Sequence, residues 1–346
     1  MPEGRRPPHA SGAMERLSQA LSDEVDGKRT CVLVLGDGVN QEAAGKRGSN
    51  DWQRVLSAVW REAGGSPDDF DPTGKSTATL WSHLVRQWAA HRGAHRTAAE
   101  LAIRGRVAAR LRATLENGGR GRRLLSKLVD GRFANLISFS IDRRLALGTP
   151  SRRIVYRRPR EGFLFRHVDV TGPRGRTKVW FPYGDSGSPS SIELDHSTYD
   201  GRLVLFEESR ARLMDTHNSW DGGYGPGLRP PQYVFDHSWS EPQSWFDLFM
   251  CAPLVFVGAS LPDDDWPLWW LLHQRARYFV PFKKGECAET FYLTTSDAET
   301  HHIQNGAAGL EMVTFSNHAA LWKFVLSAVE APGADLRAWA DRRFRP

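Results

Sequence analysis

Residues 31–36 read Cys-Val-Leu-Val-Leu-Gly (CVLVLG), and this unbroken apolar run decides the fold class that the sequence predicts. A short strand that is apolar at every position is typical of a parallel sheet with both faces buried. Similar runs recur at 134–140 (ANLISFS), 253–258 (PLVFVG), 290–295 (TFYLTT) and 311–316 (EMVTFS). Helical patterns lie between the runs, and the alternation of the two patterns predicts an α/β fold.

The composition is that of an ordinary globular protein, with 346 residues, 40% hydrophobic and 25% charged, and a net charge of +6. No apolar stretch approaches the roughly 18 uncharged residues that a membrane helix needs, and the first residues lack the apolar segment of a signal peptide. The three cysteines form no CxxC pair, which excludes a disulfide framework and a four-cysteine zinc ribbon. We therefore expect a soluble, cytoplasmic protein without a metal site.

The hydrophobic pattern divides the chain into segments. Residues 1–28 are expected to form a flexible leader with a short helix, and residues 29–331 the main domain. The alternating pattern at 153–181 predicts short antiparallel strands or a hairpin insertion. Residues 215–240 are rich in Gly, Pro and aromatic side chains without a period, which predicts a long loop. Residues 332–346 are expected to be a C-terminal helix or tail.

Glycines and polar residues stand directly after several predicted strands. Gly36-Asp37-Gly38-Val39-Asn40 follows the first strand, and glycines there allow a tight turn and a close approach of the backbone to a pyrophosphate. The third glycine of a dinucleotide fingerprint is missing. Three further segments each run from a strand into a polar end: Leu136–Gly148, Lys178–Asp200 and Val255–Arg277.

In this order the segments resemble the SIR2-like family, specifically the bacterial SIR2-like NAD-hydrolysing domains of antiphage defence. The strand-GAG-V-S element of the family is similar to VLVLGDGVN, and its T-T-N-Y-D element to SFSID at Ser138–Asp142. Its K-L-H-G element, followed by S-I-I-L-T and D-Y, is similar to FPYG at Phe181–Gly184, followed by SIEL at Ser191–Leu194 and Thr198-Tyr199. Its V-G-x-S-L-x-D element is nearly intact in VGASLPD at Val257–Asp263. The matches span roughly residues 30–330.

The resemblance implies a doubly wound, Rossmann-like parallel sheet with a smaller helical insertion at about residues 70–130. It also implies that NAD or a related nucleotide binds beyond the carboxyl ends of the strands. The zinc ribbon of the deacetylating sirtuins has no counterpart here, so no zinc is expected. The residues that match the cofactor-binding elements of the family are Gly36, Asp37, Gly38, Asn40, Gly258, Ser260 and Leu261.

The catalytic positions of the family are substituted in this chain. The resemblance places Ser140, Tyr183 and Asp142 where the family has Asn, His and Asp. A tyrosine with an ordinary pKa of about 10 is protonated at neutral pH and is therefore a poor general base. A serine lacks the carbonyl and amide pair that orients a ribose or a water. Asp37 adds a carboxylate where a pyrophosphate would lie, which repels an anion.

These substitutions favour a SIR2-like pseudoenzyme, acting as a structural or ligand-sensing subunit of a bacterial defence or stress complex. Its expected partner is an active effector, with which it would form a hetero-oligomer. Exposed tryptophans anchor protein interfaces, and the sequence offers candidates at Trp220, Trp239 and Trp245.

Two alternatives remain open. The first is an active NAD+ glycohydrolase in which His167, His196 or Asp142 replaces the missing base. The second is nucleotide or nucleic-acid binding, because 38 of the 46 cationic residues are arginine and many of them cluster at 104–112, 120–123 and 152–160. That alternative predicts one contiguous basic face, whereas solvated helix faces would scatter the arginines.

Overall fold

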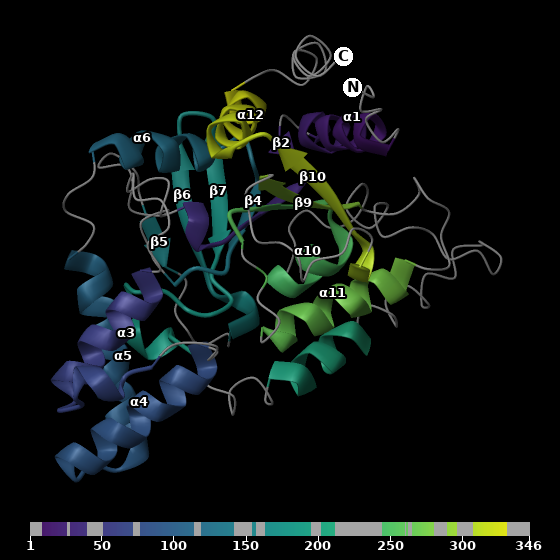
Figure 1. The fold of residues 1–346 in the computed structure, drawn as a ribbon. Helices are drawn as coiled ribbons and strands as arrows, with labels where there is room; N and C mark the ends of the chain where they lie inside the picture. Colours follow the sequence, from purple (N-terminus) through teal and green to yellow (C-terminus); the bar gives the residue numbers. More distant parts are fainter. Residues whose placement is uncertain are drawn as a thin grey trace, which may run out of the picture.

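The computed structural model (Figure 1) is centred on an eight-stranded sheet with the order β10-β9-β8-β3-β4-β7-β6-β5. The residues that the structure describes are 9–25, 28–39, 51–71, 77–113, 119–141, 154–156, 163–194, 202–211, 244–259, 261, 265–279, 289–295 and 307–330. The strands of this sheet are β3 (Val32–Leu35), β4 (Asn135–Ser138), β5 (Ile154–Tyr156), β6 (His167–Gly172), β7 (Gly175–Trp180), β8 (Leu254–Val257), β9 (Thr290–Thr295) and β10 (Leu310–Phe315). A separate antiparallel pair is formed by β1 (Glu24–Val25) and β2 (Lys28–Arg29).

Six neighbouring strands, from β10 to β7, run parallel. Numbered along the chain, these six lie in the order 3-2-1-4-5-6 across the sheet, which is the order of Rossmann sheets. The prediction of an α/β fold with a mostly parallel, Rossmann-like sheet is confirmed. The alternating segment at 153–181 supplies β5 and β6, which extend one edge antiparallel, and β7, which is itself the third parallel strand.

Helices cover both faces of the sheet, because alternate residues of each central strand point to opposite sides. Leu33 and Leu35 of β3 face one core, which is covered by α1 (His9–Ser22), α6 (Gly119–Leu128) and α12 (His318–Glu330). Val32 and Val34 face the other core, covered by α10 (Trp245–Cys251), α11 (Trp266–Phe279) and the helix at residues 202–211. In the described part of the chain, no helix has the length and apolar character needed to cross a membrane.

The short helix expected within residues 1–28 is confirmed, but in the residues that the structure describes it packs on the main domain and is not a flexible leader. Residues 9–22 form α1, whose Leu17 has no exposed surface and joins the core that α12 covers. Arg16 also pairs with Glu289 at 2.8 Å and with Glu311 on β10. Ala13, Leu17, Ala20 and Leu21 fall on one helix face, which gives α1 an apolar side to bury.

The helical insertion has different bounds from the expected 70–130. Its three helices, α3 (Asp51–Glu62), α4 (Thr77–Arg92) and α5 (Arg96–Ala113), share a core of their own. α6 belongs instead to the sheet, where its Lys127 pairs with Glu330 of α12. The core of the insertion also includes Tyr183, Ile192 and Leu194, so the insertion packs against the segment that follows β7. This contact brings the insertion to the carboxyl ends of the strands.

Two predicted features lie outside the described residues, namely the loop at 215–240 and the tail at 332–346, and so do Trp220 and Trp239. Trp245 was expected to be an exposed interface residue, and this is wrong. It begins α10, in which all seven residues are buried, and its side chain belongs to the core under α11.

Candidate functional site

Four strands of the parallel sheet end side by side, and the segments after them are bonded to one another. The strand order reverses between β3 and β8, where open α/β sheets bind ligands. Phe139 after β4 donates its backbone N–H to Leu35 of β3, at 2.9 Å. Ser186 after β7 donates to the carbonyl of Ile141, at 2.8 Å. The carboxyl edge of the sheet is therefore one continuous structure, and it is the candidate functional site.

The turns after β3 and β8 pack directly on each other. A Cβ added at Gly36 would lie 2.4 Å from the Cα of Ala259, and one at Gly38 would lie 2.8 Å from the carbonyl oxygen of Gly258, so both positions require glycine. The backbone N–H groups of Gly36, Gly38 and Val39 donate to the carbonyls of Val257, Gly258 and Gly36. These three amides are thus committed to the protein backbone.

The structure brings together most of the residues expected to bind a cofactor. Gly36, Asp37, Gly38 and Gly258 form the paired turns, and Leu261 is buried beside them with a left-handed φ of 44°. Asn40 and Ser260 lie outside the described residues.

NAD fits the described turns poorly. Dinucleotide sites hold a pyrophosphate on the free amides of such a turn, whereas three amides here bond to carbonyls and Asp37 adds a carboxylate at the start of the following helix. We therefore derive no chemical step through NAD.

The second strand end holds Ser140, which is buried. Its carbonyl accepts a hydrogen bond from the Ser138 hydroxyl at 3.1 Å. Asp142 lies outside the described residues, so its predicted role is not placed.

Tyr183 is enclosed by aromatic and charged groups from three other segments. Its hydroxyl donates to Oδ1 of Asp265, just before α11, at 2.6 Å. Its ring lies 5.4 Å from the ring of Phe139, and the guanidinium of Arg202 lies over it at 4.9 Å, within the range of a cation–π contact. Only 8% of the residue is exposed, because the insertion closes over this segment. Packing of the ring and the hydrogen bond of the hydroxyl therefore both hold the tyrosine in place.

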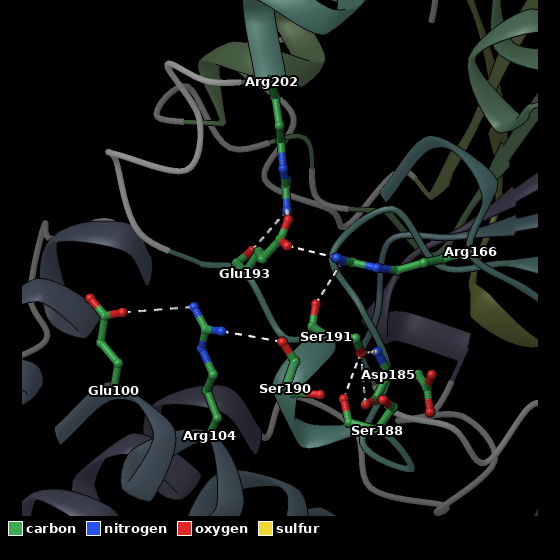
Figure 2. Close-up of polar contacts among 9 residues, drawn as sticks. All are labelled: Glu100, Arg104, Arg166, Asp185, Ser188, Ser190, Ser191, Glu193 and Arg202. Atoms are coloured by element: carbon green, nitrogen blue, oxygen red, sulfur yellow. Dashed lines mark hydrogen bonds and ion pairs between the residues drawn. The ribbon is translucent and has the colours of Figure 1, made fainter. Parts of the chain in front are cut away.

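Next to Tyr183, two arginines hold one glutamate (Figure 2). Arg166, just before β6, donates to Oε1 of Glu193 at 2.7 Å and to the carbonyl of Ser191 at 2.7 Å. Arg202 donates from one nitrogen to Oε2 of Glu193 at 3.0 Å and to the carbonyl of the same residue at 3.2 Å. Burial on its own would raise the pKa of Glu193, but the hydrogen bonds and charges of Arg166 and Arg202 outweigh burial and hold the pKa below its ordinary value. Glu193 is therefore a carboxylate at neutral pH.

A third arginine joins this segment to the insertion. Arg104 of α5 donates to the carbonyl of Ser190 at 3.2 Å and pairs with Glu100 at 3.8 Å (Figure 2). The turn itself is fixed by Asp185, whose carboxylate accepts from the N–H of Gly187, and by Ser191, whose hydroxyl accepts from the N–H of Asp185. The segment after β7 is thus held from the insertion, from β6 and from the helix at 202–211.

Sequence reasoning missed Arg166, Glu193, Arg202 and Asp265. The one signal available was Glu193 itself, a lone acid between Ile192 and Leu194, both of which are buried. A charged residue in an apolar run needs a partner, although the run does not say which one.

Of the histidines predicted as substitute bases, the structure describes only His167. His167 is buried on β6, with Nδ1 at 2.8 Å from the carbonyl oxygen of Phe165 and its ring centroid 4.6 Å from that of Trp180. His196 lies outside the described residues. Among the described residues, no group of His, Cys, Asp and Glu side chains has the arrangement of a metal site.

Comparison with known proteins does not identify the chain. No protein-family model matches it, and no curated protein shows significant similarity to it.

Proposed function

We propose that this protein is a SIR2-like pseudoenzyme, a structural or ligand-sensing subunit of a bacterial defence or stress complex. The proposal joins the sequence motifs at the strand ends to a sheet whose six parallel strands have the Rossmann order. Its partner would be an active effector, and a nucleotide ligand such as NAD would need phosphate donors other than the three committed amides of the turn after β3.

One observation carries the proposal, namely the state of Tyr183. A general base must offer a lone pair to the proton that it removes, with hydrogen-bond reach to substrate or water. The hydroxyl of Tyr183 instead donates to Asp265 at 2.6 Å, and Arg202 covers the ring. These contacts support a structural role for Tyr183, which the resemblance aligns with the family's histidine, and Ser140 is also buried.

The experiment follows nicotinamide release from NAD+ by NMR and nucleotide binding by calorimetry on the same purified protein. It is run on the protein alone and with candidate partner proteins, because a defence enzyme can be silent until it is triggered. We expect no release from either preparation. Release that Tyr183→Phe abolishes would overturn the pseudoenzyme proposal.

One observation favours the active NAD+ glycohydrolase as a second candidate. Asp265 is a carboxylate within hydrogen-bond distance of the Tyr183 hydroxyl, and a carboxylate in that place can accept a proton. Release that Asp265→Asn abolishes would establish this candidate.

Nucleic-acid binding gains no support from the described arginines. Of the cluster at 104–112, Arg104 pairs with Glu100, while Arg106 and Arg110 both pair with Glu62. The arginine side chains at 120–123 and 152–160 lie outside the described residues.

A further inference from the structure

We propose that Arg166 and Arg202 form an oxyanion-binding cage, which Glu193 occupies from within the chain as a displaceable internal ligand. The ligand class of this cage is a carboxylate or phosphate group. The inference deepens the proposed function and in part rests on it, because it places the acidic group of a sensed nucleotide beside Tyr183.

The geometry of the cage is that of oxyanion recognition. Each guanidinium contacts a different carboxylate oxygen, at 2.7 Å from Arg166 and at 3.0 Å from Arg202 (Figure 2). Guanidinium groups bind carboxylate and phosphate with the same planar donor pattern, so a phosphate can replace the carboxylate on the same donors.

The cations are fixed more firmly than the anion. The side chain of Arg202 is only 3% exposed, and its guanidinium is also held against Tyr183 and the carbonyl of Glu193. Arg166 is anchored by the carbonyl of Ser191. The side chain of Glu193 is 20% exposed, the most of the three. Arg166 is 17% exposed, close to the value for Glu193, so its second bond to the Ser191 carbonyl and the burial of Arg202 are what would hold the two guanidinium groups when the carboxylate leaves.

The position of the cage links it to the candidate site. Arg202 contacts both the Glu193 carboxylate and the ring of Tyr183. A group that replaces the carboxylate would therefore bind the same guanidinium that covers the tyrosine. Three amides of the turn after β3, those of Gly36, Gly38 and Val39, bond to backbone carbonyls, whereas the arginines of the cage carry the positive charge that a phosphate needs. A ligand must displace the Glu193 carboxylate to bind Arg166 and Arg202, so the glutamate competes with the ligand for the two arginines.

The first test is chemical rescue of Glu193→Ala, which leaves two arginines without their carboxylate. Thermal melting is measured in sodium chloride, sodium acetate and sodium phosphate at equal pH and ionic strength. Acetate or phosphate should raise the melting temperature of this variant by about 2–4 °C over chloride, as expected for an anion present at several times its Kd. The matched control is Glu62→Ala, because Glu62 also lies between two arginines, but those are 61% and 42% exposed. The control and the wild type should show no preference among the salts.

An equal response of Glu193→Ala and the control would overturn the cage. If Glu193→Ala does not fold, Glu193→Ser, which also removes the carboxylate and leaves its place open, is tested in the same way.

The second test measures the affinity of wild type and Glu193→Gln for NAD+ and ADP-ribose by calorimetry. Removing the internal competitor should tighten binding about tenfold or more. Equal affinities would show that the nucleotide binds elsewhere and would overturn the link to the cage. Rescue by acetate and phosphate without nucleotide binding to either protein would support the cage for a free oxyanion and count against the proposed nucleotide sensing, so the two failures are distinguishable.

Discussion

Replacing Tyr183 with phenylalanine separates its structural role from a catalytic one. The change removes a single oxygen and keeps the ring, which retains its contacts with Phe139 and Arg202. The lost hydrogen bond runs to a carboxylate, and bonds to charged groups contribute about 1.5–3 kcal/mol. Asp265 is half-buried, so water can replace part of the lost donor. We therefore expect the free energy of unfolding to fall by about 1.5 kcal/mol, the lower end of that range.

Urea unfolding followed by circular dichroism measures this loss, with an unchanged dependence on urea as the sign of a two-state comparison. The matched control is Tyr292→Phe, since Tyr292 also donates at 2.6 Å, but to the neutral carbonyl of Ala259. That variant should lose about 1 kcal/mol. A double-mutant cycle with Asp265→Asn isolates the interaction between the two side chains.

Two results would refute the reasoning. A Tyr183→Phe protein as stable as the wild type, within about 0.5 kcal/mol, would show that the hydroxyl is not committed to Asp265. Nicotinamide release by the wild type that disappears in Tyr183→Phe would show that the hydroxyl is catalytic.

Three further predictions concern the stability of the site and its support. The pKa of Glu193 is lower in the folded protein than its ordinary value of 4.5, so the ionised carboxylate stabilises the folded state at neutral pH. This contribution is lost as the pH falls from 4.5 through the lower folded pKa. In acid unfolding curves, the stability of Glu193→Gln should therefore fall less steeply than that of the wild type. Gly184→Ala should lower the free energy of unfolding in urea by about 3 kcal/mol, because φ is 85° and the new Cβ would lie 2.1 Å from the carbonyl oxygen of Ser191. The control Gly93→Ala, where φ is also positive but the new Cβ meets no atom, should lower it by about 1 kcal/mol. Arg275→Met should lower the free energy of unfolding by about 3–5 kcal/mol in the same assay, because the buried guanidinium donates to three buried acceptors at 2.6–2.8 Å. An unchanged free energy of unfolding would show that these hydrogen bonds do not stabilise the fold.

The central strands could be predicted from the sequence because burial on both faces requires an apolar residue at every position. β3 and β8 meet that requirement without exception, and both were found in place. The glycines after them were also predicted, since a turn that packs on another turn cannot carry a Cβ at Gly36. The helix in the leader was also predicted, but its packing on the core was not, because its residues are apolar on one face only and short chain ends with that pattern are as often unattached.

The polar part of the site could be predicted only in outline. Tyr183 differs from the histidine of the family that the sequence resembles. Its partner Asp265 lies 82 residues away, and no local sequence pattern joins the two. The same holds for Glu193, whose arginine partners come from before β6 and from the helix at 202–211. Such side-chain pairs form only when helices and strands that are distant in the sequence pack together. Helix and strand propensities and hydrophobic periodicity describe single elements and do not predict which elements pack together.

Tyr183 is held in one chain of contacts with four charged residues, and this chain bears on the proposed function. From Asp265 the contacts run through the Tyr183 hydroxyl to its ring, then to the guanidinium of Arg202, the carboxylate of Glu193 and the guanidinium of Arg166. Glu193 lies between the opposite charges of Arg202 and Arg166, and the neutral ring of Tyr183 separates Arg202 from Asp265. A histidine at position 183 would replace the phenol that Asp265 binds and the ring that Arg202 covers, and both groups would need new partners. We therefore expect Tyr183→His alone to remove the hydrogen bond to Asp265 and the ring that Arg202 covers, which agrees with the proposed role other than hydrolysis.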